Sequence, residues 1–191
     1  PAAELAAWQD ALVTFMKKLT LKVARPIVLK SPPHTCRIKL LLELFPAARF
    51  VHVRRNPYTV FQSTRHLNTV IMGAVQFQRF NPATVDEAIF ARYKVMHDVF
   101  FEERGLIPAG QFHELAFEDL EADPIGQMRL VYDNLGLPCF DGIYPQLSAY
   151  VRILAGYRKN EYPALPDALR ERIAREWRRT FEEWNYPLDG P

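Results

Sequence analysis

Apolar residues recur along the chain with two different periods, and the period distinguishes predicted helices from predicted strands. Between residues 3 and 19 they recur every three or four positions, which predicts a helix with one apolar face. Shorter runs rich in β-branched and aromatic residues predict buried strands instead. These predicted strands cover residues 26–30, 49–54 and 111–117.

Helical patterns follow and separate the predicted strands. Thr84 and Glu87 have the spacing of a capping box, which predicts that a long helix begins there. Consecutive prolines in residues 31–35 predict a loop that contains no helix. Residues 69–83 show no pattern that favours either state. With this long helix at 84–104, the predicted helices after the first cover residues 36–45, 58–67, 124–135 and 166–184.

The alternation of strands and helices predicts an α/β fold, with a parallel sheet that carries helices on both faces. No internal repeat or linker divides the sequence, so residues 1–191 are interpreted as one domain. In open α/β sheets, ligands bind beyond the carboxyl ends of the strands. Polar residues follow each predicted strand at this position: Lys30-Ser31, Arg54-Arg55 and Glu118-Asp119.

Composition excludes several classes of protein and adds no positive assignment. The net charge of +2 gives no global argument for nucleic-acid binding. Two cysteines, Cys36 and Cys139, support neither a disulfide framework nor a zinc site, and a reducing, cytoplasmic location is the default expectation. No apolar run approaches the length of a membrane span, and no signal peptide is visible. The histidines show no metal-ligand spacing, so we expect no metal.

Arg55 is the first candidate for binding chemistry. Its guanidinium would lie at a strand end, next to the start of a helix at about Pro57. Free backbone N–H groups and the helix dipole would add to the guanidinium in binding an anion. Ser63, eight residues later, could donate one more hydrogen bond. The alternative is that Arg54 and Arg55 are solvated charges and that Ser63 is a surface residue.

The loop after the first predicted strand is the second candidate. Lys30 supplies a point charge suited to phosphate or sulfate oxygens, and His34 is a natural general base near neutral pH. Taken singly, each could be an ordinary surface residue. If the first two strands are neighbours, however, this loop and Arg55 lie side by side, which favours a shared role.

These residues resemble a known family, the sulfotransferases that use 3′-phosphoadenosine 5′-phosphosulfate (PAPS). The resemblance is carried by 27-IVLKSPPH-34 and 51-VHVRRNPYTVFQS-63, and the form of these segments is closest to the bacterial-type branch. The segments 117-FEDLEADPIGQMRLVYDNLGLP-138 and 157-YRKNEYPALP-166 are also similar, so the resemblance covers about residues 20–185. It implies a core like that of the P-loop nucleotide hydrolases, PAPS as co-substrate and no metal.

The resemblance also implies a role for each candidate residue that binds the nucleotide. Arg55 and Ser63 would bind the 3′-phosphate, which gives a reason for the paired arginines at the strand end. Arg158 and Lys159 match, more weakly, a late basic pair that reaches the same phosphate.

Lys30 and His34 would carry the transfer reaction itself. Lys30 would stabilise charge on the sulfuryl group, and His34 would take the proton from the attacking hydroxyl. The interval of four residues between them is longer than in many family members. The resemblance implies a small-molecule or glycan acceptor and does not identify it.

The sequence departs from the family in one respect. It contains no phosphosulfate-binding loop of the type P-R-S-G-T-T, so the fold is expected to be an N-terminally truncated sulfotransferase core. A second hypothesis is therefore a non-catalytic module that binds a protein partner or forms a homodimer through an unpaired sheet edge. A third hypothesis, an anion or nucleic-acid binder, is disfavoured by the near-neutral net charge.

Overall fold

A computed structural model describes residues 2–75 and 83–188 of the chain. The ambiguous stretch at 69–83 is helical as far as Val75, and residues 76–82 lie outside the described residues. The two strands are β1 (Phe50–Arg54) and β2 (Phe112–Ala116). The helices are α1 (Ala2–Lys22), η1 (Pro32–Cys36), α2 (Ile38–Leu44), α3 (Pro57–Val75), α4 (Ala83–Glu103), η2 (Arg104–Leu106), α5 (Phe117–Ala122), α6 (Pro124–Asn134), α7 (Phe140–Leu154), α8 (Asp167–Glu176) and α9 (Arg178–Trp184).

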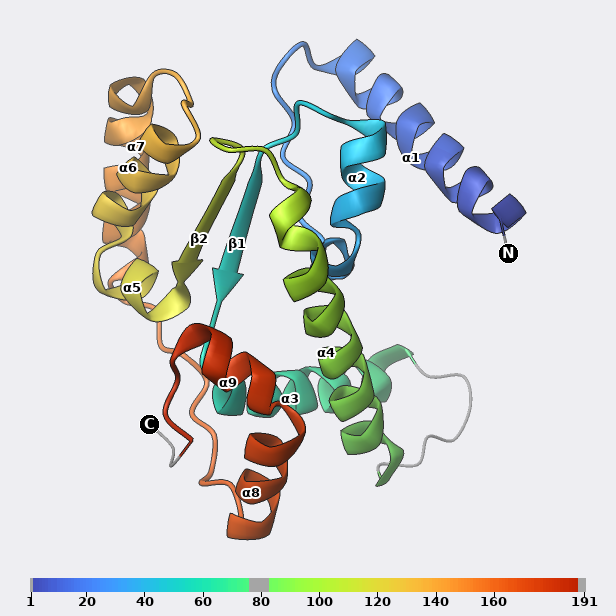
Figure 1. The fold of residues 1–191 in the computed structure, drawn as a ribbon. Coiled ribbons are helices and arrows are strands. Elements are labelled where there is room, and N and C mark those ends of the chain that lie inside the picture. Colours follow the sequence, from blue (N-terminus) through green and yellow to red (C-terminus); the bar gives the residue numbers. More distant parts are fainter. Residues whose placement is uncertain (1, 76–82, 189–191) are drawn as a thin grey trace.

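Strands β1 and β2 pair in parallel, which confirms two of the three predicted strands and their relative direction. Phe50 lies opposite Phe112, and Arg54 lies opposite Ala116. The carboxyl ends of both strands therefore meet at one edge of the sheet, as the two arrowheads show (Figure 1). This edge is where the sequence predicts a ligand site.

Helices pack on both faces of this sheet, as predicted. On one face, the imidazole of His52 stacks on Phe100 of α4, with ring centroids 4.1 Å apart. On the other face, Leu115 packs against Val131 of α6 and against Leu135, which follows that helix. The two sets of helices lie on opposite sides of the strands in Figure 1.

The largest core cluster lies beyond the sheet, between α3, α4 and the two C-terminal helices. Trp177 stacks on Tyr93 of α4 with ring centroids 3.7 Å apart. Phe61 of α3 and Phe90 of α4 complete the contact around the indole. Aromatic side chains bury large areas, and Trp177, Phe61 and Phe181 of this cluster are among the largest fully buried side chains described.

The C-terminal helix α9 is tied to the sheet by polar contacts. The guanidinium of Arg54 donates to the carbonyl oxygen of Trp184 at 3.1 Å. The Trp184 indole donates to Glu114 Oε1 at 3.2 Å, and His52 Nδ1 lies 3.0 Å from the same oxygen. Burial alone would raise the pKa of Glu114, but the hydrogen bond to His52 lowers it below its usual value.

The strand predicted at residues 26–30 is wrong. This segment is extended, but it makes no ladder hydrogen bonds to the described strands, and Val28 is 90% exposed. A short β-branched run predicts a strand only where a neighbour supplies the pairing, and no described strand lies beside this one. The loop predicted at residues 31–35 is also wrong, because η1 begins with its two prolines in the first turn, where the missing N–H groups are tolerated.

Several helix boundaries differ from their predictions. The helix predicted at 166–184 is two helices, because the backbone departs from helical geometry at Trp177 and directs the indole into the core. Helices α5 and α7 were not predicted, and α7 contains Gly142 and Pro145, which weaken a helical pattern. Thr84 is the second residue of α4, and Glu87 pairs with Arg172.

Candidate functional site

Arg54 and Arg55, at the end of β1, lie in different environments. Arg54 is held by the Trp184 carbonyl and lies over the Tyr186 ring. The Arg55 guanidinium lies 4.1 Å from the ring centroid of Phe117, the first residue after β2. In the described structure, Arg55 makes no hydrogen bond or ion pair. Its cation is therefore oriented by an aromatic ring at the carboxyl end of the sheet and keeps all its donors for a ligand.

Asn56 fixes the start of α3 directly after Arg55. Its side-chain oxygen accepts a hydrogen bond from the Tyr58 N–H at 2.9 Å, which is an N-cap interaction, and Pro57 occupies the first helical position. The prediction that free N–H groups of this helix would add to the anion site therefore needs correction. One of them is used by the cap, and Pro57 has none.

Glu118 holds the turn between β1 and α3 in place. One carboxylate oxygen accepts from the backbone N–H of Asn56 at 2.9 Å, and the other accepts from the Tyr186 hydroxyl at 2.9 Å. Burial and this hydrogen bond raise the pKa of Tyr186. Glu118 thus connects the end of β2, the end of β1 and the C-terminal segment, which keeps Arg55 next to Phe117.

Ser63 lies two turns into α3 and is half-buried. A later segment of the chain runs along this helix: Gln62 donates to the Pro163 carbonyl at 2.7 Å, and the His66 ring lies 5.9 Å from the Tyr162 ring. Arg158 and Lys159 precede Tyr162 by four and three residues, and Lys159 contacts α5 rather than α3.

The two basic residues of that pair differ in their contacts. Lys159 donates to Glu121 of α5 at 2.7 Å, whereas Arg158 is exposed and has no partner among the described residues. The Lys159–Glu121 pair is itself exposed, so it contributes little stability and can exchange for a stronger anion.

Lys30 and His34 precede α2 and β1 in the chain. Lys30 is exposed at the end of the unpaired segment. His34 lies in η1, which packs against α4. Burial and the nearby Arg37 charge lower the pKa of His34 below its ordinary value. Its Nδ1 is buried without a hydrogen-bond partner, so at neutral pH the imidazole is an uncharged base.

The six predicted site residues are not joined directly. Across the described ranges, no hydrogen bond, ion pair or ring contact links any two of them. The sequence prediction also missed Phe117, the platform for Arg55, and Asn56, the cap of α3. An Asn-Pro dipeptide after a strand is a signal for the cap, whereas nothing local to Arg55 indicates Phe117.

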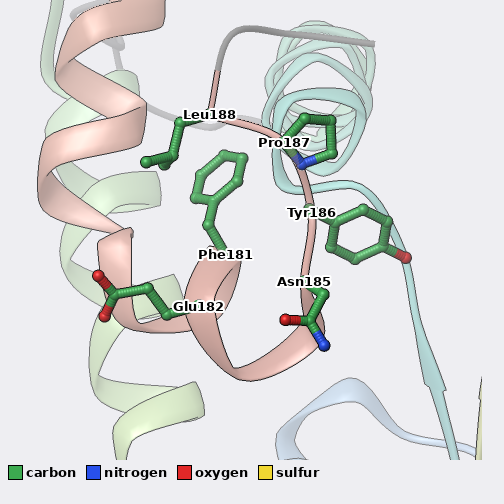
Figure 2. A pocket seen from close by; sticks show the side chains of 6 residues that line it. All are labelled: Phe181, Glu182, Asn185, Tyr186, Pro187 and Leu188. Atoms are coloured by element: carbon green, nitrogen blue, oxygen red, sulfur yellow. The ribbon is translucent and has the colours of Figure 1, made fainter.

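Figure 2 shows a hollow beside the C-terminal turn. It is lined by Phe181, Glu182 and residues 185–188. Phe181 points toward Pro187 and Leu188, while Tyr186 points away from it. None of the six predicted site residues lines this hollow, and its lining offers no cation to an anionic ligand.

Comparison with known proteins decides the family. Residues 2–142, well over half of the chain, match the sulfotransferase family. This chain belongs to the sulfotransferase family. The resemblance seen in its sequence is therefore confirmed, and the match includes the segments that carry Lys30, His34, Arg55 and Ser63.

Two curated sulfotransferases are similar to the chain over nearly its whole length. The omega-hydroxy-beta-dihydromenaquinone-9 sulfotransferases Stf3 of Mycobacterium bovis and Mycobacterium tuberculosis are each 32% identical to it over 188 residues. The alignment covers 98% of this chain and 48% of each relative. The chain thus spans about half the length of the curated relatives it matches.

A solved structure confirms the fold. The crystal structure of sulfotransferase STF9 from Mycobacterium avium matches with a TM-score of 0.66, covering 85% of this chain and 43% of that protein. The sequences are 20% identical, so this likeness shows the fold alone. The predicted α/β sulfotransferase core is correct, and these comparisons do not support the non-catalytic alternative.

The described residues form neither a metal-binding cluster nor a membrane-spanning helix. No group of three or more histidine, cysteine, aspartate or glutamate side chains is placed to hold a metal ion in the described ranges. None of the helices described for this chain combines the length and the apolar character that crossing a bilayer requires.

Proposed function

We propose that this chain binds the 3′-phosphate end of PAPS and supplies the base for sulfuryl transfer to the hydroxyl of a small-molecule acceptor. The observation that carries the proposal is the contrast between Arg54 and Arg55. Arg54 is occupied by the Trp184 carbonyl, whereas the Arg55 guanidinium has no polar partner in the described chain and lies over Phe117 at the carboxyl end of the sheet. A cation held in this way is suited to a phosphate.

The remaining nucleotide contacts come from α3 and the segment beside it. Ser63 would donate its hydroxyl to the 3′-phosphate, and Arg158 and Lys159 would add positive charge from the later segment. The contacts from Gln62 to Pro163 and from His66 to Tyr162 support this grouping, because they hold the later segment along α3. The sequence holds no P-R-S-G-T-T loop, so the proposal assigns no residue to the 5′ end of the nucleotide.

His34 and Lys30 would act on the transferring group. PAPS supplies the sulfuryl group, which passes to the acceptor oxygen as the S–O bond of the phosphosulfate breaks. The uncharged imidazole of His34 would accept the proton that leaves the acceptor hydroxyl. Lys30, exposed and without a partner among the described residues, would stabilise negative charge on the sulfuryl oxygens.

The curated relatives support one class of acceptor. Their names specify a hydroxylated menaquinone, a lipid whose hydroxyl lies at the end of an apolar chain. We extend this to the present chain as a proposal: the acceptor is a lipid alcohol rather than a sugar or a peptide.

Calorimetric titration with 3′,5′-adenosine bisphosphate, with AMP as the control ligand, tests the nucleotide site. We expect the bisphosphate to bind and AMP to bind far more weakly. Arg55→Ala should lower the affinity by about 10- to 100-fold, since a charged hydrogen-bonding contact contributes about 1.5–3 kcal/mol. Arg92→Ala, which removes an exposed arginine from α4, should leave the affinity unchanged. Equal affinities for Arg55→Ala and the parent protein would refute the assignment.

His34→Ala separates binding from chemistry. The variant should bind 3′,5′-adenosine bisphosphate like the parent protein, while the release of that product from PAPS in the presence of a long-chain hydroxylated quinone should fall by about 10²-fold or more. Thr35→Ala, the neighbouring change in η1, is the matched control and should retain turnover. Undiminished turnover in His34→Ala would show that another group takes the proton.

A further inference from the structure

Arg55 has a carboxylate as a close neighbour in the fold, and the two do not pair in the described chain. Glu118 directly follows Phe117, the residue whose ring centroid lies 4.1 Å from the Arg55 guanidinium. The Glu118 carboxylate also accepts a hydrogen bond from the backbone N–H of Asn56, the residue directly after Arg55. Opposite charges that approach in this way attract each other, so the lack of an ion pair needs a physical reason.

Two hydrogen bonds to Glu118 supply that reason. One carboxylate oxygen accepts from the Asn56 N–H and the other accepts from the Tyr186 hydroxyl, each at 2.9 Å. With both oxygens held, the carboxylate has a fixed orientation. Burial and the hydrogen bond to Glu118 raise the pKa of Tyr186, so its hydroxyl keeps its proton at physiological pH and remains a donor.

A less restrained carboxylate in the same short helix does pair with a basic residue. Glu121, like Glu118, lies in α5, and among the described residues its carboxylate has a single donor, Lys159, at 2.7 Å. If Glu118 lost its bond to Tyr186, one of its oxygens would become available to Arg55. A carboxylate in that position would compete with a phosphate for the guanidinium.

The Tyr186 hydroxyl is not the only attachment of the C-terminal segment to the rest of the fold. Arg54 donates to the Trp184 carbonyl, two residues before Tyr186. The Tyr58 hydroxyl donates to the Leu188 carbonyl, two residues after it. The acceptors of these two bonds are backbone carbonyls, whereas the acceptor of the Tyr186 bond is a charged side chain at the candidate site. The Tyr186 bond therefore has a role that the other two cannot fill.

We propose that Tyr186 is a positioning residue of the anion site at Arg55: its hydroxyl restrains the Glu118 carboxylate and so keeps the Arg55 guanidinium available for a ligand. The identity of that ligand, the 3′-phosphate of the nucleotide, rests on the proposed function. The restraint itself rests on the contacts of Glu118. Because Glu118 is exposed, a released carboxylate would compete with the phosphate only moderately.

Rescue by a second substitution tests this role. Tyr186→Phe removes only the hydroxyl, and it should weaken binding of 3′,5′-adenosine bisphosphate by about three- to fivefold in calorimetric titration. Tyr186→Phe/Glu118→Gln should bind like the parent protein, because the amide keeps an acceptor for the Asn56 N–H and carries no negative charge. Tyr186→Phe/Asp119→Asn removes the neighbouring charge of the same helix, and it should bind as weakly as Tyr186→Phe.

The matched control is Tyr58→Phe, which removes a hydroxyl contact to the same C-terminal segment and releases no carboxylate. It should lower the midpoint of urea denaturation and leave the affinity for the bisphosphate unchanged. Equal losses of affinity in Tyr58→Phe and Tyr186→Phe would show that Tyr186 only braces the segment. A failure of Glu118→Gln to restore binding in the Tyr186→Phe background would also overturn the proposal.

Nitrogen-15 NMR of the arginine side chains tests the restraint without a nucleotide. The Arg55 Nε–H signal, identified by its absence from Arg55→Ala, should exchange with water more slowly in Tyr186→Phe than in the parent protein, because a carboxylate then accepts from the guanidinium. Adding Glu118→Gln should reverse the change. An Arg55 signal that is the same in Tyr186→Phe and the parent protein would refute the restraint.

The two measurements distinguish the restraint from the proposed function. If the Arg55 signal changes as expected and the parent protein does not bind the bisphosphate, the proposed function fails and the restraint on Glu118 stands. If the parent protein binds the bisphosphate and Tyr186→Phe binds it equally well, the positioning role fails and the proposed function stands.

Discussion

Residues 50–188 and residues 2–36 were predicted from similar patterns, yet they are packed very differently. In the first region, the described strands pair and Trp177, Phe61 and Phe181 are almost fully buried. In the second, the 21-residue helix α1 has no buried residue, and the segment at 26–30 is unpaired. A periodic apolar pattern shows which face of a segment is to be covered, but the covering partner must come from elsewhere in the fold.

We expect the largest difference in stability between the two regions from substitutions of Trp177 and Trp8. Trp177→Ala should lower the free energy of unfolding by about 3–5 kcal/mol, because it leaves a cavity between Tyr93 and Phe61. Trp8→Ala removes a partly exposed ring that contacts Arg37, so it should cost about 1 kcal/mol or less. Urea denaturation measures both. Similar costs would mean that α1 is packed as firmly as the core.

Two histidines give a second test, through pH. Burial lowers the pKa of His97 to about 4, although its hydrogen bond to the Tyr93 carbonyl and the nearby Asp98 and Glu114 carboxylates oppose the shift. His52 adds a like charge when protonated. The folded state therefore binds fewer protons than the unfolded state between pH 6.5 and 4, so stability falls as the pH falls through this window.

The expected loss is about 3 kcal/mol by pH 4, and His97→Gln should abolish that part of the pH dependence. Denaturation curves of the parent protein and of His97→Gln, recorded between pH 7 and 4, measure this loss. Subtracting one free energy of unfolding from the other cancels the contribution of carboxylates that titrate alike in both proteins. His34→Gln, in the more exposed η1, should change the pH profile much less. Parallel profiles for His97→Gln and the parent protein would contradict the assignment.

The smallest expected effect concerns the unpaired segment. Val28→Thr replaces an apolar side chain that is 90% exposed, so the midpoint of urea denaturation should shift by less than the equivalent of about 0.5 kcal/mol. Val131→Thr, which puts a hydroxyl into the buried cluster beneath β2, is the matched comparison and should cost clearly more. A large cost for Val28→Thr would show that residues 26–30 are packed in solution.

The sequence predicted the elements that have local signals. Strand β1 is a short run with two valines that ends in arginines, β2 is a short, partly apolar run followed by Glu118 and Asp119, and both were found. The same kind of run at 26–30 was misassigned, because strand pairing is a non-local property. The break at Trp177 was missed for a similar reason: the backbone departs from the helix to place an indole against Tyr93, 84 positions earlier in the chain.

The candidate site was predicted in part. Arg55 lies at the carboxyl end of a parallel strand, as the pattern indicated. The sequence alone did not distinguish Arg55 from its neighbour Arg54. That difference comes from Trp184 and Phe117, which are distant in sequence and reach the two guanidiniums only in the fold. The roles of Arg55 and of Lys30, His34, Ser63, Arg158 and Lys159 stay predictions, because they depend on a ligand.

The contacts of the C-terminal segment also determine when the protein can fold during synthesis. Arg54 and Tyr58 each bond to a carbonyl that follows 130 residues later. A ribosome needs on the order of ten seconds to add that length of chain. Until residue 188 has left the exit tunnel, the end of β1 and the aromatic cluster behind it lack their closing helix and expose apolar surface. Chaperones that recognise such surface therefore have a long window in which to bind the nascent chain.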